Sequence, residues 1–273
     1  MKKIISTLIL TLVYGLGIAQ NSQPSGAPVK TISILPVTMS FNLKNGEAGY
    51  QKINILNQLD QKKQFRVYLS DWERDTVGQH VYTEPGTDQN SCANWVSFDK
   101  SFFELDPNQS ENINVKIQLP DSINEPDRMK WCMLFIETIQ ENKMTNEKGL
   151  TTSIASKLRF GIHIYQTPPT TTLSEIKLLD FTSSNENKKY RITCKNTGQT
   201  QIECHSYLEL VSVLDGTKTK LPKQEFPMFP NQTRYIDFTL PEDVQKGKYL
   251  ITGVVDGGEE LALEVAQLSI EIK

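Results

Sequence analysis

Residues 105–110, Leu-Asp-Pro-Asn-Gln-Ser, decide the fold of this chain, because the pattern returns at residues 228–233 as Met-Phe-Pro-Asn-Gln-Thr. The first copy is followed by apolar residues at 113, 115 and 117, a Leu-Pro pair at 119–120 and Trp131. The second is followed by apolar residues at 236 and 238, a Leu-Pro pair at 240–241 and Tyr249. A turn, a short strand, a Leu-Pro stop and an aromatic strand in one order predict two tandem copies of one β architecture.

Short strands surround both copies. Ile53 and Ile55 alternate with polar residues up to Asn57, and residues 158–164 alternate apolar and polar side chains. Such alternation is typical of half-buried antiparallel strands, whereas the nearly continuous apolar run at residues 131–136 predicts a central strand covered on both faces. No amphipathic helix of useful length is present. About seven short strands in each ~110 residues predict an all-β protein of two immunoglobulin-like β-sandwich domains.

The ends of these units follow from composition. Residues 1–19 have two lysines, an apolar run and a Gly-Ile-Ala end, which is the pattern of a cleavable signal peptide. The polar residues 20–30 predict a flexible leader. We expect one sandwich over residues 31–168 and another over residues 169–273, because the pair Pro168-Pro169 ends a strand and stiffens the connection.

The charge restricts the partners. Loss of two signal-peptide lysines leaves 27 of the 29 basic residues against 32 acidic ones, a net charge of −5. This balance argues against nucleic acid and anionic membrane surfaces as partners. No second long apolar run follows the signal, so we expect no membrane insertion of the mature chain.

Four cysteines remain after the signal: Cys92, Cys132, Cys194 and Cys204. An even count in an exported protein predicts two disulfides, and the repeat divides the residues into one pair per domain. We therefore expect Cys92 to pair with Cys132 and Cys194 with Cys204. The alternative is a metal site, which the lack of a Cys-x-x-Cys spacing disfavours.

No catalytic constellation is visible. The histidines at 80, 163 and 205 lack a Gly-x-Ser-x-Gly or a His-Glu-x-x-His motif, so each is expected to be an ordinary strand or loop residue. We expect no enzyme, no cofactor, no metal and no catalytic residue.

The first domain resembles the N-terminal domain of PapD-like periplasmic chaperones, which assist pilus assembly. The residues that carry the resemblance are Ile34-Leu35-Pro36 with Phe41, Ile53 to Asn57, Asn94-Trp95-Val96-Ser97 with Phe103, Leu119-Pro120 with Trp131 to Phe135, and Phe160 to Pro168. The resemblance covers residues 31–168 and follows core positions. The second domain fits a general immunoglobulin-like fold.

The resemblance implies a mechanism. Such chaperones lend the last strand of the first domain to an incomplete subunit, and two basic residues clamp the subunit's C-terminal carboxylate. The first-strand position of the clamp holds Thr38 here. Lys157 and Arg159 are the candidate clamp residues, and Ile154, Leu158 and Phe160 are the candidate apolar contacts. The alternative is that the charged residues line a solvated strand face and the apolar ones pack their own core.

These observations favour a periplasmic, PapD-like chaperone or assembly factor that binds subunits of a surface fibre or a secreted assembly, and the resemblance implies strand addition as the mode of binding. The second hypothesis is a structural interaction module of a cell-envelope assembly or secretion machine that has no chaperone role.

Overall fold

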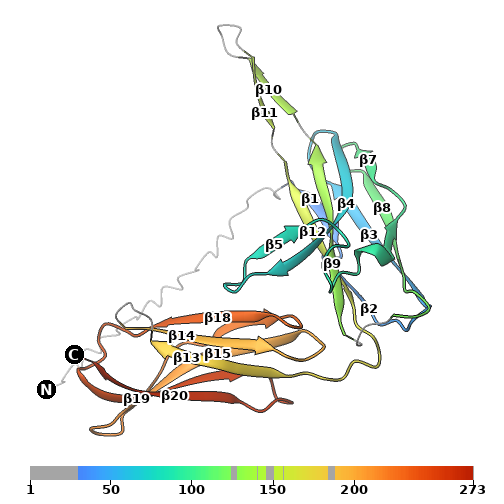
Figure 1. Ribbon diagram of the computed structural model, residues 1–273. Coiled ribbons are helices and arrows are strands. Elements are labelled where there is room, and N and C mark those ends of the chain that lie inside the picture. Colours follow the sequence, from blue (N-terminus) through green and yellow to red (C-terminus); the bar gives the residue numbers. More distant parts are fainter. Residues whose placement is uncertain are drawn as a thin grey trace, which may run out of the picture.

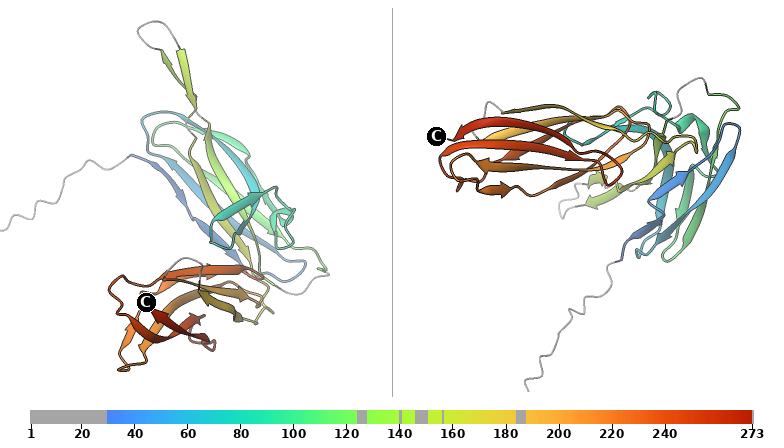
Figure 2. Two further views of the ribbon diagram at one scale, coloured as in Figure 1. Left: turned by 60° about the vertical axis from the view of Figure 1, so that its left-hand side comes forward. Right: turned by 90° about the horizontal axis from the view of Figure 1, so that it is seen from below.

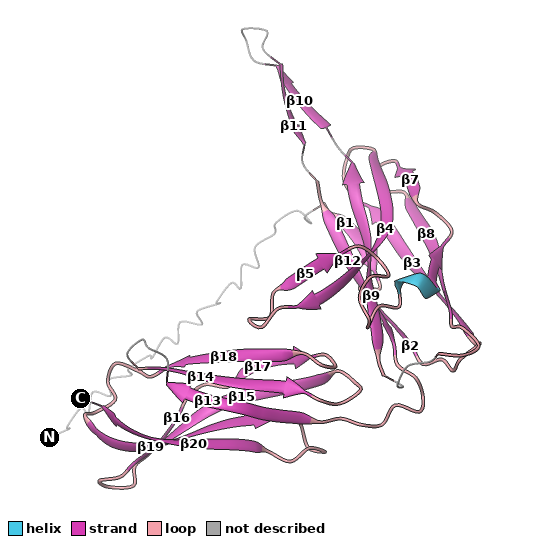
Figure 3. Ribbon diagram, viewed as in Figure 1, coloured by secondary structure: helices cyan, strands magenta, loops and turns pink. Residues whose placement is uncertain are grey.

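The computed structural model describes residues 30–123, 128–139, 141–145, 151–155, 157–183 and 188–272, with the side chains of 141–145 and 151–155 left out. The expected signal peptide and nearly all of the leader lie outside these residues. The regular structure of the described chain is β-strand, apart from one 3₁₀ turn at Ala93–Trp95 (Figure 3). Two β-sandwiches follow each other along the chain (Figure 1), so the predicted all-β fold of two immunoglobulin-like domains is confirmed.

Twelve strands form the first domain and its projecting hairpin: β1 (Ile32–Leu35), β2 (Thr38–Phe41), β3 (Ala48–Asn57), β4 (Lys63–Arg74), β5 (His80–Thr83), β6 (Val96–Phe98), β7 (Phe102–Leu105), β8 (Ser110–Gln118), β9 (Lys130–Ile139), β10 (Glu141–Thr145), β11 (Thr151–Ala155) and β12 (Arg159–Gln166). One sheet has the order β1-β3-β8-β6. The other has the order β2-β12-β9-β4-β5, with β7 also paired to β4.

The chain changes sheets at Pro36. β1 pairs antiparallel with β3 in one sheet, whereas β2, which begins two residues after Pro36, runs parallel to β12 in the other. Proline has no backbone N–H to give to a ladder, so it marks the point where the first ladder stops. The N-terminal segment therefore joins both sheets of the sandwich.

β9 lies at the centre of its sheet, between β12 and β4, and its residues from Lys130 to Thr138 are buried. Its inward side chains, such as Leu134 and Ile136, pack in the core of the sandwich. Trp131, Met133 and Phe135 face the other way and form a second cluster with Trp72. The prediction of a central strand covered on both faces is confirmed.

Two polar segments of the first domain contain strands that no sequence pattern predicts. Residues 78–92 include β5, which pairs with β4, and residues 141–149 include β10, which pairs with β11. Neither strand shows the apolar alternation that sequence patterns detect, because His80–Thr83 is mostly exposed and residues 141–145 are polar. The β10–β11 hairpin projects beyond the sandwich, as a continuation of β9 and β12 (Figure 1).

The second sandwich has eight strands: β13 (Ile176–Ser183), β14 (Lys189–Asn196), β15 (Ile202–Ser212), β16 (Lys218–Lys220), β17 (Gln224–Met228), β18 (Thr233–Thr239), β19 (Gly247–Asp256) and β20 (Glu264–Ile272). One sheet has the order β13-β14-β18 and the other the order β16-β15-β19-β20, with β17 also paired to β15. Its core contains Ile192, Leu208 and Ile251, which are fully buried.

The two copies of the sequence repeat make the same pattern of backbone hydrogen bonds. In the first domain the Asn57 N–H donates to Gln109 O at 3.0 Å, and the Asn108 N–H donates to Asn57 O at 2.7 Å. In the second the Asn196 N–H donates to Gln232 O, and the Asn231 N–H to Asn196 O, both at 3.0 Å.

Two further features complete the match. Asn108 and Asn231 both adopt a positive φ, 61° and 65°, which asparagine tolerates better than most residues. Asn57 and Asn196 are both fully buried, and their side-chain amides donate to backbone carbonyls across the turn. Each Pro-Asn-Gln turn is therefore fixed to a buried asparagine at the end of a neighbouring strand.

Candidate partner-binding sites

The first half of β12 has a free edge. β12 pairs with β9 along its whole length, but β2 pairs with it only from His163 onward. The His163 N–H donates to Val37 O at 3.0 Å, so the backbone groups of alternate residues, Arg159 and Gly161, point to the same side. Within the described chain no strand pairs with Arg159–Ile162 on that side. We call these four residues the free edge.

Apolar side chains flank the free edge. Val37 and Leu158 are 60% and 49% exposed. Val37 lies directly beside β12, and Leu158 precedes its first residue. An unpaired strand edge with exposed apolar side chains is a template for pairing with another chain. Phe160 is half-buried and packs against the core of the first domain, so it is not presented like Leu158.

Lys157 and Arg159 interact within their own domain. The Lys157 ammonium lies 3.5 Å from Glu137, which also contacts Arg66 at 3.3 Å and accepts a hydrogen bond from the Tyr68 hydroxyl at 2.9 Å. Burial raises the pKa of the Glu137 carboxyl, but this hydrogen bond and the two cations outweigh burial and leave that pKa below its ordinary value. The carboxylate therefore stays charged and holds Lys157.

The Arg159 guanidinium lies over two rings of the same sheet surface. Its Cζ is 4.5 Å from the ring centroid of Phe135 and 5.2 Å from that of Tyr82. Gly161, next on this face, allows the approach: a β-carbon there would lie 2.8 Å from Met133 Sδ. Lys157 and Arg159 are thus near each other but already engaged.

The structure does not bring Thr38 to these two cations. Thr38 is in register with His163, four residues further along β12 than Arg159. The His163 ring lies 5.0 Å from Trp72, and burial, together with His80 and Arg74, lowers its pKa to about 4. A neutral imidazole, and not a lysine, is the neighbour of Thr38. Ile154 lies on β11, and its side chain is outside the described residues.

The cysteines are buried free thiols in the structure, so neither predicted bridge is formed in it. Cys92 and Cys132 are nevertheless neighbours, with Sγ atoms 3.5 Å apart. Cys194 Sγ lies 3.5 Å from Met228 Sδ, and burial raises the pKa of both Cys194 and Cys204 to about 12. The pairing of the cysteines stays a prediction.

The two domains meet where the β4–β5 hairpin reaches β18 (Figure 2). The Tyr235 N–H donates to Thr76 O at 2.8 Å, and the Gln232 side chain donates to Arg74 O at 3.3 Å. The Phe229 ring lies 5.0 Å from the rings of both Trp72 and Trp131. Backbone bonds and an aromatic contact therefore fix the second domain against the first.

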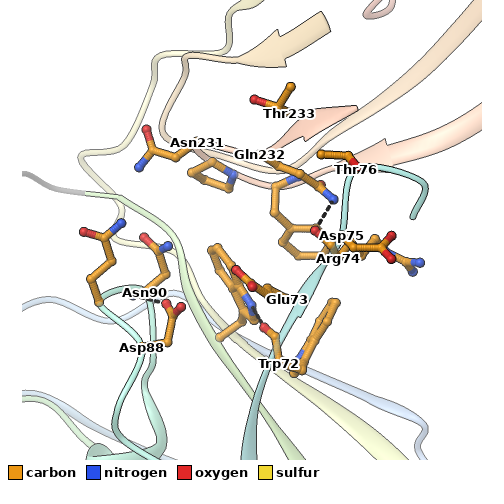
Figure 4. Close-up of a pocket in the computed structure, with 14 residues that line it drawn as sticks. Trp72, Glu73, Arg74, Asp75, Thr76, Asp88, Asn90, Asn231, Gln232 and Thr233 are labelled. Carbon is orange, nitrogen blue, oxygen red and sulfur yellow. Dashed lines mark hydrogen bonds between the residues drawn. The ribbon is translucent and has the colours of Figure 1, made fainter. Parts of the chain in front are cut away.

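A pocket of about 430 Å³ lies at this junction. Figure 4 shows Glu73, near the end of β4, and Asp75, just after it, facing the turn of Asn231 and Gln232, with Asp88 and Asn90 on a third side. We call it the interdomain pocket. No motif of the sequence predicted it.

One residue of the repeat contained a signal for this junction. The position before the proline is Asp106 in the first turn, where it is exposed, and Phe229 in the second, where it is 4% exposed. An aromatic residue at a turn position that is otherwise polar indicates a contact outside its own domain.

Other kinds of site are not found in the described chain. It contains no group of three or more His, Cys, Asp or Glu side chains placed to hold a metal. None of its helical segments has the length and hydropathy to cross a bilayer.

Several of the solved structures similar to this chain contain fimbrial chaperones. A chain of the chaperone–tip adhesin complex of CFA/I fimbriae is 11% identical, with a TM-score of 0.49 over 87% of this chain and 98% of that one. A chain of the CsuC–CsuE chaperone–tip adhesion subunit complex of Acinetobacter baumannii is 13% identical, with a TM-score of 0.44 over 87% and 97%. The E. coli chaperone DraB is 12% identical, with a TM-score of 0.43 over 89% and 97%.

No protein-family model and no curated protein sequence matches the chain.

Proposed function

We propose that this chain is a periplasmic chaperone or assembly factor that binds an incomplete subunit of a surface fibre or secreted assembly by strand addition. The observation that carries the proposal is the free edge of β12, with the exposed side chains of Val37 and Leu158 at its two ends. An added strand would take its affinity from the backbone of Arg159 and Gly161, and its specificity from alternate side chains.

The β10–β11 hairpin supports the proposal, because β11 approaches β12 along the chain and extends the surface past the sandwich (Figure 1). Lys157 and Arg159 lie at this end of β12, close to where the hairpin begins. In this arrangement Lys157 and Arg159 contact the end of the subunit's strand that lies farthest from the domain junction.

A proline substitution tests whether subunit binding requires the backbone N–H groups of the free edge. Arg159→Pro removes an N–H that points to the free edge while leaving the ladder to β9 intact, because proline fits the first residue of a strand. We expect the variant to fold normally and to lose most of its subunit capture, measured by copurification from the periplasm. Its matched control is Arg159→Ala, which removes the same side chain but keeps the N–H.

A charged substitution at Leu158 tests whether subunit binding requires its apolar contact. Leu158→Asp is expected to weaken capture about tenfold or more, since it places a carboxylate where an apolar contact forms. Leu214→Asp, at a side chain 94% exposed on the second domain, is the control. If Leu158→Asp and Arg159→Pro both leave capture unchanged, strand addition at β12 is wrong.

One observation favours the second candidate, a structural module with one dedicated partner. Lys157 already pairs with Glu137, and the residue in register with Thr38 is a neutral histidine, so the two-cation clamp is not assembled. Crosslinking in the periplasm separates the candidates: capture of several unfolded subunits supports a chaperone, and one stoichiometric partner supports the module.

A further inference from the structure

The interdomain pocket is rich in hydrogen-bond acceptors. Its lining includes the carboxylates of Glu73, Asp75 and Asp88 and contains one basic residue, Arg74. That guanidinium makes two contacts elsewhere, since its Nη1 donates to Gly78 O at 2.8 Å and its Cζ lies 5.8 Å from the Trp72 ring, while its buried Nε has no hydrogen-bond partner in the described chain. The pocket thus has an excess of negative charge.

Asn90 provides a second and independent observation. Its side chain lines the pocket, the residue is 7% exposed, and its Oδ1 has no hydrogen-bond partner. The backbone of Asn90 is fully used: its N–H donates to Asp88 and its carbonyl accepts from Trp131. A buried amide oxygen without a donor is costly, and a ligand that donates hydrogen bonds would satisfy it.

The floor of the pocket is aromatic. Trp72, Trp131 and Phe229 all line it, and Phe229 comes from the second domain. The face of an aromatic ring attracts a cation, most strongly when the ring is indole. Carboxylates at the rim, an amide oxygen in the wall and rings at the floor all favour a cation that donates hydrogen bonds.

We propose that the interdomain pocket binds the basic side chain, arginine or lysine, of a partner polypeptide. A guanidinium carries five N–H donors and a flat face that stacks on rings, so arginine matches the lining better than lysine. The pocket volume of about 430 Å³ accommodates such a side chain together with its own backbone. The proposal does not depend on strand addition, because the pocket shares no residue with the free edge.

The experiment uses the mature chain and two capped peptides, acetyl-Gly-Gly-Arg-Gly-Gly-amide and the same peptide with glutamine. Trp72 and Trp131 in the pocket report binding by fluorescence, and calorimetry gives the affinity. We expect saturable binding of the arginine peptide, weakened by salt, and no binding of the glutamine peptide.

The variants test the site. Glu73→Gln removes an exposed carboxylate and is expected to weaken binding about fivefold. Asn90→Leu keeps the size of the side chain without its oxygen and is expected to weaken binding further. The control is Glu260→Gln, an exposed carboxylate in the turn before β20. Circular dichroism verifies the fold of each variant.

Three results would overturn the proposal: equal binding of the two peptides, unchanged affinity in both pocket variants, or binding of free agmatine as tight as that of the arginine peptide. The last would make the pocket a site for a small cation. Failure here is distinct from failure of the proposed function, which the Arg159→Pro and Leu158→Asp variants measure separately.

Discussion

The guanidinium of Arg234, on β18 of the second domain, lies against the α-carbon of Gly78, in the β4–β5 turn of the first: a β-carbon on Gly78 would stand 1.7 Å from Arg234 Nη1. Arg74 reaches the same glycine and donates to its carbonyl oxygen. The absence of a side chain at one turn residue therefore allows both domains to close on each other.

Gly78→Ala is expected to open the domain junction. Gly78 has a φ of 91°, so alanine there is strained by about 1 kcal/mol or more, and its β-carbon also displaces Arg234. Small-angle scattering should show a larger radius of gyration, and the melting temperature should fall. Gly258→Ala is a matched control, because its φ is 102° and no atom lies within 4 Å of the added carbon. Equal effects of the two substitutions would contradict the role assigned to Gly78.

Phe229→Asp gives the second turn the residue that the first has at Asp106. It removes a ring that contacts Trp72 and Trp131, and burial of such a ring stabilises by about 3 kcal/mol. We expect the domains to separate while each sandwich stays folded, measured by scattering together with far-ultraviolet circular dichroism. The same substitution should red-shift tryptophan emission. An unchanged radius of gyration would show that the backbone bonds at Thr76 and Arg74 suffice.

The thiols of Cys92 and Cys132 are expected to be oxidised in the exported protein, because their Sγ atoms lie 3.5 Å apart. Peptide mapping of the unreduced protein should find them linked. Reduction should lower the free energy of unfolding by about 4 kcal/mol, the loop-closure contribution of a bridge between residues 92 and 132. Cys132→Ala should show no such dependence on reductant. Four titratable thiols in the denatured, unreduced protein would contradict this prediction.

Stability should fall in mild acid because of two half-buried histidines, His163 and His80. Desolvation lowers the pKa of His163 from 6.5 to about 4, and also lowers the pKa of His80. The unfolded chain therefore takes up protons first as the pH falls, so this contribution is complete above about pH 6.5 and is lost progressively toward pH 4.

His163→Phe keeps a ring beside Trp72. When the urea midpoint of unfolding is plotted against pH between about 4 and 6.5, this substitution should reduce the slope. His205→Phe, at a partly exposed histidine of the second domain, should leave the slope as it is. A His163→Phe slope equal to that of the unmodified chain would mean that other groups cause the acid sensitivity.

Core positions made the fold predictable. The alternation at Ile53 and Ile55 and the continuous run at residues 131–136 reflect burial within one sandwich, which a local pattern records. The two Pro-Asn-Gln turns were predictable for the same reason, since each is bonded to its own domain.

The sites were less predictable because they depend on contacts between distant segments. Nothing local distinguishes Arg159 as the start of a free edge, since that edge exists only because β2 reaches no further than His163. The junction places Trp72, Asn90 and Phe229 together from three segments. Strands β5 and β10 were missed because neither His80–Thr83 nor the polar residues 141–145 have an apolar period to detect.

The turn at Gln232 makes hydrogen bonds to both domains. It is bonded rigidly to its own sandwich through Asn196 and to the end of β4 through Arg74. Any rotation of the second domain must therefore move one wall of the interdomain pocket relative to the other. The width of the pocket therefore depends on the angle between the two sandwiches. An occupant that fits only one width would stabilise the corresponding angle between the domains.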